Sequence, residues 1–500
     1  MDEYRLAGAV TSGDWDEVDH VLDEDFFFYL FEHPDLLEEV FAAAPAEWYQ
    51  RHPRNVMSRA IAEAARRPVM LIDGAVLQEF GDWVRSQEHP AVRDLLGLQQ
   101  PGMRALLAAG RYREAAAMTD EALRLIDSAD DMEGFPDVLP SVLLRCGTVK
   151  LLVGELEQAT AIYAEALRWA TVRFEHPWAR YAREHLAFAY ALSEQYRQAR
   201  ELLLGLSVEP HAPGTIRFHY QEPGILALAL VLAGSQTGNA EVALSRIALS
   251  ASGTWWWVPI HVHAIDALVK GTQLAAMREI GHALVTERVR TEPRSLVGAI
   301  LRTDLATLQQ SMGDLRRAHR VLNTPGLSST WLGTRVAKAR QEWLQGNPAG
   351  AVEVLQNEES SAGIPLANQV EGSIVYAEAE RAASGSVDDR VVKFVASAVN
   401  ATGAVARLTQ ASPELRDALE PLVSRPITGI PIRFAPLPRP RLTRREREVL
   451  EALAGNATIP ELARTLHVSP NTVKSHLRAL YRKLGVHSRE DALWLARRTM

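Results

Sequence analysis

The residues best suited to recognition chemistry lie in one stretch, residues 469–484. Four apolar residues recur there at the helical spacing i, i+4, i+7 and i+11: Val473, Leu477, Leu480 and Leu484. This spacing predicts a helix with one buried face. Polar and cationic residues lie on its other faces: Lys474, Ser475, Arg478 and Arg482. The positive end of a helix dipole suits phosphate, and long cations reach guanine O6 and N7, so the stretch predicts nucleic-acid recognition.

The surrounding sequence contains the caps of further short helices. Thr443 with Glu446, and Thr458 with Glu461, have the spacing of capping boxes. A third helix has its own start signal, Ser469 as N-cap followed by Pro470. We expect helices from Thr443 to Gly455, from Thr458 to Leu466, from Pro470 to a stop at Gly485, and from Arg489 to Arg498. Because the second and third are only a few residues apart, they predict a helix-turn-helix.

The charge of the chain divides unevenly. Residues 441–500 carry 12 Lys and Arg against 6 Asp and Glu, a net charge of +6. The other 440 residues carry 42 against 56, a net charge of −14. Because phosphate attracts the first part and repels the second, we expect a polyanion partner for the C-terminal part alone.

The sequence of this part is similar to a known family. LTRREREVLEALAG and ELARTLHVSPNTVKSHLRALYRKLGVHSREDAL closely resemble the LuxR/NarL-type helix-turn-helix, over about sixty of the 500 residues. The resemblance implies a bacterial transcription regulator that binds double-stranded DNA. It implies base contacts for Lys474, Ser475 and Arg478, and backbone contacts for Asn471 and Thr472.

The resemblance has two further implications for DNA binding. The final helix, around Ala492 to Ala496, would support a homodimer on a two-half-site operator, with RNA polymerase as a further partner. One position departs from the family, because Ile459 and Pro460 stand where a polar and then a basic residue are common. A phosphate contact is lost there, and affinity would rest more on Arg464 and Arg482.

The long first part of the chain, residues 1–424, reads as helical throughout and contains a repeated motif. In this motif a glycine or a polar substitute opens a turn, a charged or polar stretch follows, and an Ala or Val begins a new apolar helix. Copies begin at Gly13, Gly110, Gly154, Glu194, Gly238, Gly313 and Gly346. Spacings from Gly110 onward are 44, 40, 44, 75 and 33 residues, and the interval of 75 leaves room for one degraded copy. The region resembles tetratricopeptide repeats, so we expect an all-α, TPR-like solenoid of helical hairpins.

A proline-rich segment separates the two parts. Residues 425–441 read RPITGIPIRFAPLPRPR, and five prolines in so short a stretch favour an extended, semi-rigid linker. We therefore expect a sensor or interaction region over 1–424, a linker over 425–441 and a DNA-binding domain over 442–500.

Several function classes find no support in the sequence. It has no Walker A loop, no receiver-domain pattern, no Gly-x-Ser-x-Gly, no His-Glu-x-x-His and no dinucleotide loop. We expect no enzyme activity, catalytic residue, metal or cofactor. The lone Cys146 fits a reducing cytoplasm, and no signal peptide is visible. The longest apolar run, Ile225 to Ala233, is too short to span a bilayer, so we expect a cytoplasmic, nucleoid-associated protein with no membrane partner.

Three segments of the first part remain open to two interpretations. Trp255–Trp257 with His261 and His263 suit packing between repeats, or else an aromatic ligand pocket or a metal pair. The spacing of the two histidines suits a strand better than a helix. Phe26–Tyr29 suit a buried helix start, or else a docking surface. Arg217, His219 and Tyr220 fit either a connecting loop or a groove.

These observations lead to one hypothesis and its rivals. We expect a sequence-specific DNA-binding regulator whose repeats bind a peptide, protein or small-molecule effector in their concave surface. The alternative is a TPR-like interaction scaffold whose helix-turn-helix serves mainly in dimerisation. An enzyme that uses the Trp–His segment is a third class. A sigma-factor-like domain would need a basic, aromatic melting region upstream, which the acidic first part does not offer.

Overall fold

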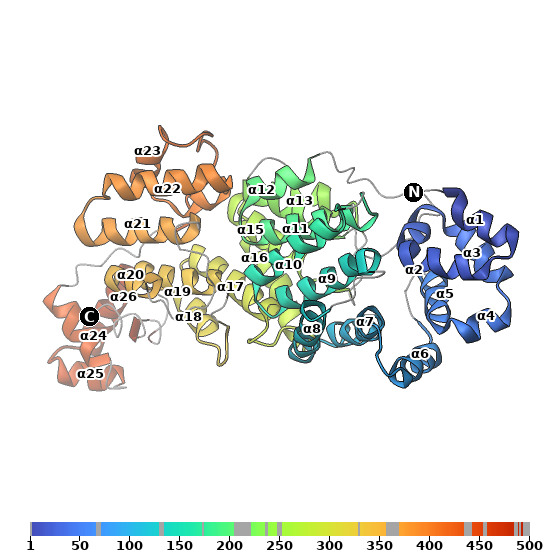
Figure 1. Cartoon of the computed structure of the whole chain (residues 1–500). Coiled ribbons are helices and arrows are strands. Elements are labelled where there is room, and N and C mark those ends of the chain that lie inside the picture. Colours follow the sequence, from blue (N-terminus) through green and yellow to red (C-terminus); the bar gives the residue numbers. More distant parts are fainter. Residues whose placement is uncertain are drawn as a thin grey trace. The chain divides into compact units, whose positions relative to one another are not determined.

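The computed structural model describes most of the chain as helices joined by short turns (Figure 1). The described residues are 3–66, 72–129, 135–172, 175–204, 222–235, 239–247, 253–328, 331–356, 370–434, 443–453, 458–484, 489 and 492–493. All regular structure in these ranges is helical, which confirms the predicted all-α class. The chain forms two compact units: unit 1 is Met1–Val262 with Glu287–Val297, and unit 2 is His263–Thr286 with Gly298–Met500.

The helices follow one another without strands in the described ranges. Those of unit 1 are α1 (Glu3–Ser12), α2 (Trp15–Glu32), α3 (Pro34–Ala43), α4 (Ala46–Arg51), α5 (Pro53–Ala65), α6 (Gly74–Ser86), α7 (Val92–Ala108), α8 (Tyr112–Asp127), α9 (Phe135–Leu152), α10 (Leu156–Trp169), α11 (Trp178–Leu192), α12 (Tyr196–Leu203), α13 (Glu222–Ser235) and α14 (Ala240–Leu244). Helix α15 (Val258–Lys270) includes the boundary between the units. Those that follow are α16 (Gln273–Thr286), α17 (Leu296–Ser311), α18 (Leu315–Leu322), α19 (Leu332–Leu344), α20 (Pro348–Gln356), α21 (Val370–Ser384), α22 (Asp389–Thr402), the 3-10 helix η2 (Val405–Gln410), α23 (Pro413–Leu419), α24 (Arg444–Leu453), α25 (Ile459–Thr465) and α26 (Pro470–Leu484).

The predicted turn residues reverse the chain between paired helices. They adopt positive φ, with 71° at Gly13, 73° at Gly110, 94° at Gly154, 76° at Gly313 and 81° at Gly346. Glu194, the polar substitute, adopts φ 62°, a conformation that a residue with a Cβ rarely takes. In each turn the next N–H donates to the carbonyl five residues back, as from Arg111 to Leu106 at 2.9 Å. This bond satisfies a carbonyl at the end of the first helix. Gly238 lies outside the described residues.

The degraded copy expected between Gly238 and Gly313 lies at Gly271. Its φ is 83°, and the N–H of Thr272 donates to the carbonyl of Ala267 at 3.3 Å. Ala276 and Ile280 follow at the spacing of the other copies and are buried.

The second helix of each hairpin packs through a small residue. The alanines five positions after the turn residue are fully buried: Ala115, Ala159, Ala199, Ala318 and Ala351. A tyrosine can then lie against a glycine of a neighbouring helix. A Cβ added at Gly147 in α9 would lie 2.5 Å from the ring of Tyr163 in α10. A Cβ at Gly234 in α13 would lie 2.1 Å from the ring of Tyr196 in α12. In both places the backbone of a glycine lies directly against the ring of a tyrosine on the neighbouring helix.

The aromatic segments of the first part are mostly buried. Trp255 contacts Phe188 with ring centroids 4.8 Å apart, and Trp257 is fully buried, which supports the packing interpretation. The expectation that the two histidines suit a strand is wrong, because both lie in helix α15. His263 pairs there with Glu279 at 3.0 Å.

Of the two other segments with two interpretations, the structure describes only one. Phe26, Phe27 and Tyr29 are buried in α2, beside a kink at Asp25. Arg217, His219 and Tyr220 lie outside the described residues. Within the described ranges, no group of three His, Cys, Asp or Glu side chains could hold a metal ion. No helix of the described part is both long and apolar enough to span a bilayer.

Residues 425–434, the first part of the predicted linker, belong to unit 2 and pack against its helices. Ile427, Ile430 and Phe434 are buried, although the segment has no regular secondary structure. Arg433 donates to the carbonyls of Leu268 and Val269 at 2.6 and 3.1 Å. The predicted extended linker is therefore bound as far as Phe434. Residues 435–442 lie outside the described residues.

The packing of Gly147 against Tyr163 gives a stability prediction. Gly147→Ala should lower the free energy of unfolding by about 1–3 kcal/mol, because the buried ring must move to admit the methyl group. The control is Gly281→Ala in α16, where an added Cβ meets nothing within 4 Å. That change should be neutral or stabilising by up to about 1 kcal/mol. Thermal and urea denaturation measure both effects; equal behaviour of the two variants would contradict the proposed packing.

Candidate nucleic-acid interface

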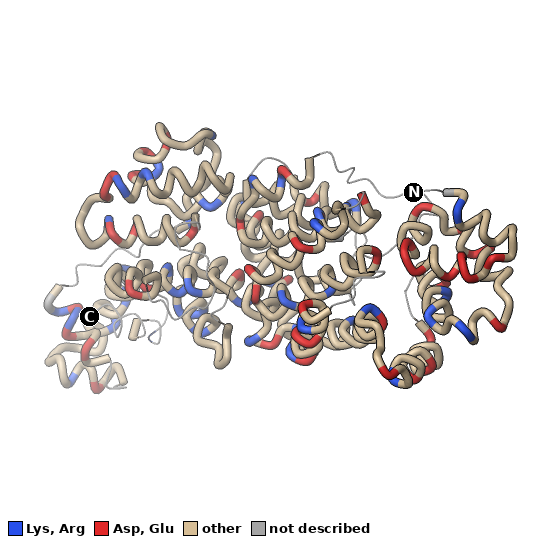
Figure 2. Tube along the Cα trace, in the orientation of Figure 1, with Lys and Arg blue, Asp and Glu red and all other residues tan. Residues whose placement is uncertain are grey.

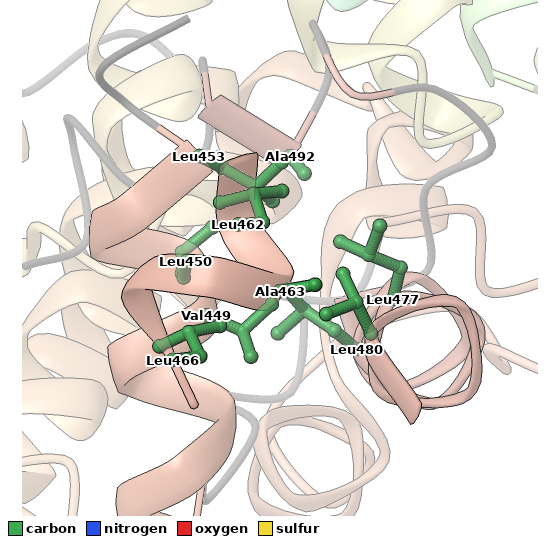
Figure 3. Close-up of a cluster of buried hydrophobic side chains, with 10 residues drawn as sticks. Val449, Leu450, Leu453, Leu462, Ala463, Leu466, Leu477, Leu480 and Ala492 are labelled. Carbon is green, nitrogen blue, oxygen red and sulfur yellow. The ribbon is translucent and has the colours of Figure 1, made fainter. Parts of the chain in front are cut away.

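Three helices near the end of the chain surround a small hydrophobic core of their own (Figure 3). The core consists of Val449, Leu450, Leu453, Leu462, Ala463, Leu466, Val473, Leu477, Leu480 and Ala492. It contains the apolar faces predicted for α24, α25 and α26, with Ile459 half-buried at its edge. The side chain of Leu484 lies outside the described residues. Because this core draws on residues 449–493 alone, it can hold the three helices together as a module.

The predicted helix starts are present. Thr443 donates its N–H to Glu446 at 2.8 Å and accepts the N–H of Glu446 at 3.2 Å, which is a capping box. Thr458 and Glu461 form the second box. The pKa of Glu461 lies below its ordinary value, first because the Thr458 N–H donates to its carboxylate. The hydroxyl of Ser469 accepts the N–H of Thr472 at 3.1 Å and so caps α26.

The turn between α25 and α26 depends on one residue in the left-handed region. His467 has φ 53°, and the N–H of Val468 donates to the carbonyl of Ala463 at 3.0 Å. The guanidinium of Arg445 in α24 donates to the carbonyl of Leu466, the last residue before the turn. The sequence predicted a turn here but not its left-handed residue or the arginine that supports it.

The recognition helix α26 presents one exposed stripe. The stripe consists of the exposed residues Asn471, Lys474, Ser475, Arg478 and Arg482, at i, i+3, i+4, i+7 and i+11. This spacing places them on one face, opposite the face that enters the core. Within the described part of the chain, Lys474, Arg478 and Arg482 make no side-chain hydrogen bond or ion pair. Three cations are thus presented to solvent with their donors available.

The other predicted site residues lie at the ends of the two helices. Thr472 is half-buried, and its hydroxyl lies 2.8 Å from that of Ser469, within the cap of α26. Arg464 is exposed in the last turn of α25. Pro460 is exposed in the first turn of α25, and Ile459 packs against the core. Neither side chain can donate to a phosphate, in keeping with the departure noted in the sequence.

One ion pair joins the first helix to the recognition helix. The ammonium of Lys483 in α26 lies 2.7 Å from the carboxylate of Glu446 in α24, which is 7% exposed. This bond, with those from Thr443, holds the pKa of Glu446 below its ordinary value. Arg489 donates to the carbonyl of Leu453 at 2.8 Å, and Leu493 packs on the core. The rest of the predicted dimerisation helix lies outside the described residues.

The pair of Glu446 and Lys483 gives a prediction for acid. Because the pKa of Glu446 is lower in the folded chain, its stabilising effect is complete above about pH 4.3 and is lost as the pH falls through the folded value. Glu446→Gln should destabilise α24 and α26 by about 1 kcal/mol at neutral pH, and should weaken their acid dependence. Hydrogen exchange of residues 444–453 and 470–484 in the intact chain measures both effects.

The control for this prediction is Glu451→Gln, in the same helix. The side chain of Glu451 is exposed and makes no hydrogen bond or ion pair within the described residues. Its replacement should leave both the neutral stability and the acid response unchanged. If both variants behave like the unmodified chain, the ion pair does not stabilise the module.

Comparison with known proteins agrees with this geometry. Residues 440–496 match the model of the bacterial regulatory proteins of the luxR family. The probable transcriptional regulatory protein NarL of Mycobacterium tuberculosis is 44% identical over 79 residues, which are 16% of this chain and 36% of that protein. The HTH-type transcriptional activator RamA of Corynebacterium glutamicum is 38% identical over 85 residues, 17% of this chain and 29% of RamA. The chain thus spans about a third of the length of these relatives.

A shorter relative is covered more fully. The spore germination protein GerE of Bacillus subtilis is 44% identical over 55 residues, which are 11% of this chain and 74% of GerE. The residues that match the luxR family model, 440–496, include all three helices of the module and the exposed stripe of α26. Through this C-terminal module, the chain belongs to the luxR family of bacterial regulatory proteins.

Proposed function

We propose that this protein is a sequence-specific, double-stranded-DNA-binding regulator of transcription. The observation that carries the proposal is the exposed stripe of α26, whose cations have no partner among the described residues, on a helix-turn-helix of the luxR family. An α-helix fits the major groove, and cations on its outer face can donate to base edges there. Names such as transcriptional regulatory protein and transcriptional activator, given to the relatives, agree with this function.

The stripe supports a division of roles along α26. Lys474, Ser475 and Arg478 lie in its second and third turns and would contact bases. Asn471 and Thr472 lie in the first turn, where helix N–H groups favour phosphate, and would contact the backbone. Arg464 and Arg482 would bind phosphate at the edges of the interface. The exposure of Arg464 and Arg482 supports this role. Pro460 cannot donate to a phosphate, so more of the phosphate binding would depend on these two arginines.

The rest of the chain would govern this module by binding. The helical hairpins of residues 1–424 would take a peptide, protein or small-molecule effector, and residues 425–441 would connect them to the DNA-binding domain, 442–500. A homodimer would place two copies of α26 on a two-half-site operator, and RNA polymerase is a further partner. We propose no catalytic step, metal or cofactor, and a cytoplasmic, nucleoid-associated location.

The first prediction concerns the base contacts. Lys474→Ala and Arg478→Ala should each weaken binding to a selected operator by about 1–3 kcal/mol and relax its sequence selectivity. The control is Arg447→Ala in α24, which removes an exposed charge from the same module but from another helix. Gel shifts on fragments selected from random DNA measure affinity and selectivity. A chain that binds no DNA before mutation would support the scaffold alternative, and equal effects of all three changes would refute the assigned contacts.

The second prediction concerns the charge of the first part. Residues 1–50 contain 14 Asp and Glu and one Arg, whereas residues 51–440 are nearly balanced, with 42 acidic and 41 basic residues. Figure 2 shows red positions predominating along α1 to α4. Removal of residues 1–424 should therefore raise DNA affinity at low salt, because phosphate no longer meets this negative field.

The salt dependence separates this effect from others. The advantage of the shortened chain should shrink as salt rises, since the Debye length falls to about 10 Å at 0.1 M and about 3 Å at 1 M. Fluorescence anisotropy on the same operator over a salt series measures it. An unchanged affinity at low salt would contradict the prediction.

A further inference from the structure

A polar face of unit 2 is completely covered by the chain itself. Arg340 in α19 and Glu378 in α21 are fully buried, and Gln310 in α17 is 2% exposed. Each lies on the first helix of a hairpin, and long polar side chains are rarely buried unless they are paired. Their burial therefore requires a covering segment with matching donors and acceptors.

The inner part of this cover is η2 and the residues that follow it. Arg340 Nε donates to Gln410 Oε1 at 2.9 Å, and Gln410 Nε2 donates to Glu371 at 2.6 Å. Arg407 donates to the same carboxylate at 3.0 Å. Glu371 thus accepts from η2, and its other oxygen lies 3.2 Å from Arg340. This layer is integral to the unit because every charge in it is paired inside.

The outer part of the cover is residues 427–434, here called the latch segment. It has no regular secondary structure, and three apolar side chains anchor it at intervals: Ile427, Ile430 and Phe434. The ring of Phe434 lies 5.0 Å from the Arg340 guanidinium carbon, in a cation–π contact. Between the anchors, Thr428, Gly429 and Ile432 are exposed. Buried anchors separated by exposed residues are how an extended peptide lies in a groove.

Arg433 attaches the C-terminal end of the latch segment to the rest of unit 2. Its N–H donates to the carbonyl of Thr409 in η2 at 2.8 Å. Its guanidinium donates to the carbonyls of Leu268 and Val269, in the last turn of α15, where no intrahelical donor is left. Across the segment, Arg416 donates to the carbonyl of Pro431 at 2.9 Å. The attachment thus depends on a few side chains rather than on a continuous backbone ladder.

We propose that the face formed by the end of α15, α19 and η2 is a peptide-binding site whose resident ligand is the chain's own latch segment. The site recognises an apolar residue, then an arginine directly followed by an aromatic ring. Arginine supplies donors for the open carbonyls of α15, and the ring covers Arg340. An effector peptide with the same chemistry would compete for this face.

Occupation of the site sets the length of the tether to the DNA-binding module, a consequence that rests on the proposed function. With the latch bound, residues 435–443 connect Phe434 to α24 and span at most about 30 Å. With the latch released, residues 427–443 span up to about 60 Å, since Ser424 remains bound to Asn400. Half-sites one helical turn apart are separated by about 34 Å. Release would therefore widen the range of half-site spacings that a dimer can reach.

Limited proteolysis of the full-length chain tests the attachment. Trypsin should cut slowly between Arg433 and Phe434 in the unmodified chain, since Phe434 is buried. Ile430→Ala and Phe434→Ala should each accelerate this cut at least tenfold, with the helical circular dichroism unchanged. The matched control is Ile432→Ala, in the same segment but 43% exposed, which should change the rate less than twofold.

A labelled peptide of residues 427–434 tests the site itself. It should bind the full-length Ile430→Ala chain saturably and bind the unmodified chain at least tenfold more weakly. A peptide with alanine in place of both Arg433 and Phe434 should bind neither chain.

Three outcomes would overturn the proposal. Unchanged cleavage in both anchor variants would show that the anchors do not hold the segment. Cleavage spread over unit 2 with loss of helix would show that the segment is an integral part of the core. No peptide binding to the released chain would exclude a separable site. No arm of the experiment uses DNA, so its failure leaves the proposed DNA binding untouched.

Discussion

The described turns of the repeated motif and the turn between α25 and α26 depend on the same backbone constraint. One residue adopts the left-handed region, and the N–H of the next residue reaches the carbonyl five positions back. The bond from Arg111 to Leu106 measures 2.9 Å, and that from Val468 to Ala463, in the helix-turn-helix, measures 3.0 Å. A helix that ends in this way leaves one fewer carbonyl without a donor and aims the next helix back along the first. The helical hairpins of the first part and the C-terminal module therefore share one local turn geometry.

The residue in the left-handed position differs between the two parts. Most of the hairpins use glycine, which adopts positive φ without steric cost. Glu194 and His467 adopt φ 62° and 53° with a Cβ present, so the surrounding packing must hold them there. For His467 that support is visible, because Arg445 binds the preceding carbonyl and the core of the module fixes both helices. The position of α26 thus depends on a residue outside its exposed stripe.

Local rules explain what the sequence could predict. Caps such as Thr443 with Glu446 and Ser469 with Thr472 join residues three positions apart, so their partners can be read directly. The two faces of α26 follow in the same way from helical periodicity. The ion pair of Glu446 with Lys483 spans 37 positions, and the bond from Arg433 to Leu268 spans 165. Nothing periodic connects such residues, so these contacts required the fold.

The proline-rich segment is a second case in which the sequence alone could not predict a contact. Its prolines correctly exclude a helix, yet they do not indicate whether an extended chain is bound or free. Ile427, Ile430 and Phe434 are spaced by three and four residues, which is the spacing of one face of a helix, although Pro431 within the stretch excludes a helix. Only the face that receives them gives the spacing a meaning.

The cations of this chain differ in whether they are paired: paired cations stabilise the fold, and unpaired exposed ones remain available to a partner. Arg340 and Arg407 share the carboxylate of Glu371 in unit 2, and Lys483 is paired with Glu446 in the module. A buried cation without such a partner would strongly destabilise the fold. Lys474, Arg478 and Arg482 are exposed and make no ion pair among the described residues, so they cost little to maintain and add nothing to the fold. Their presence on one face of one helix agrees with the proposed polyanion partner.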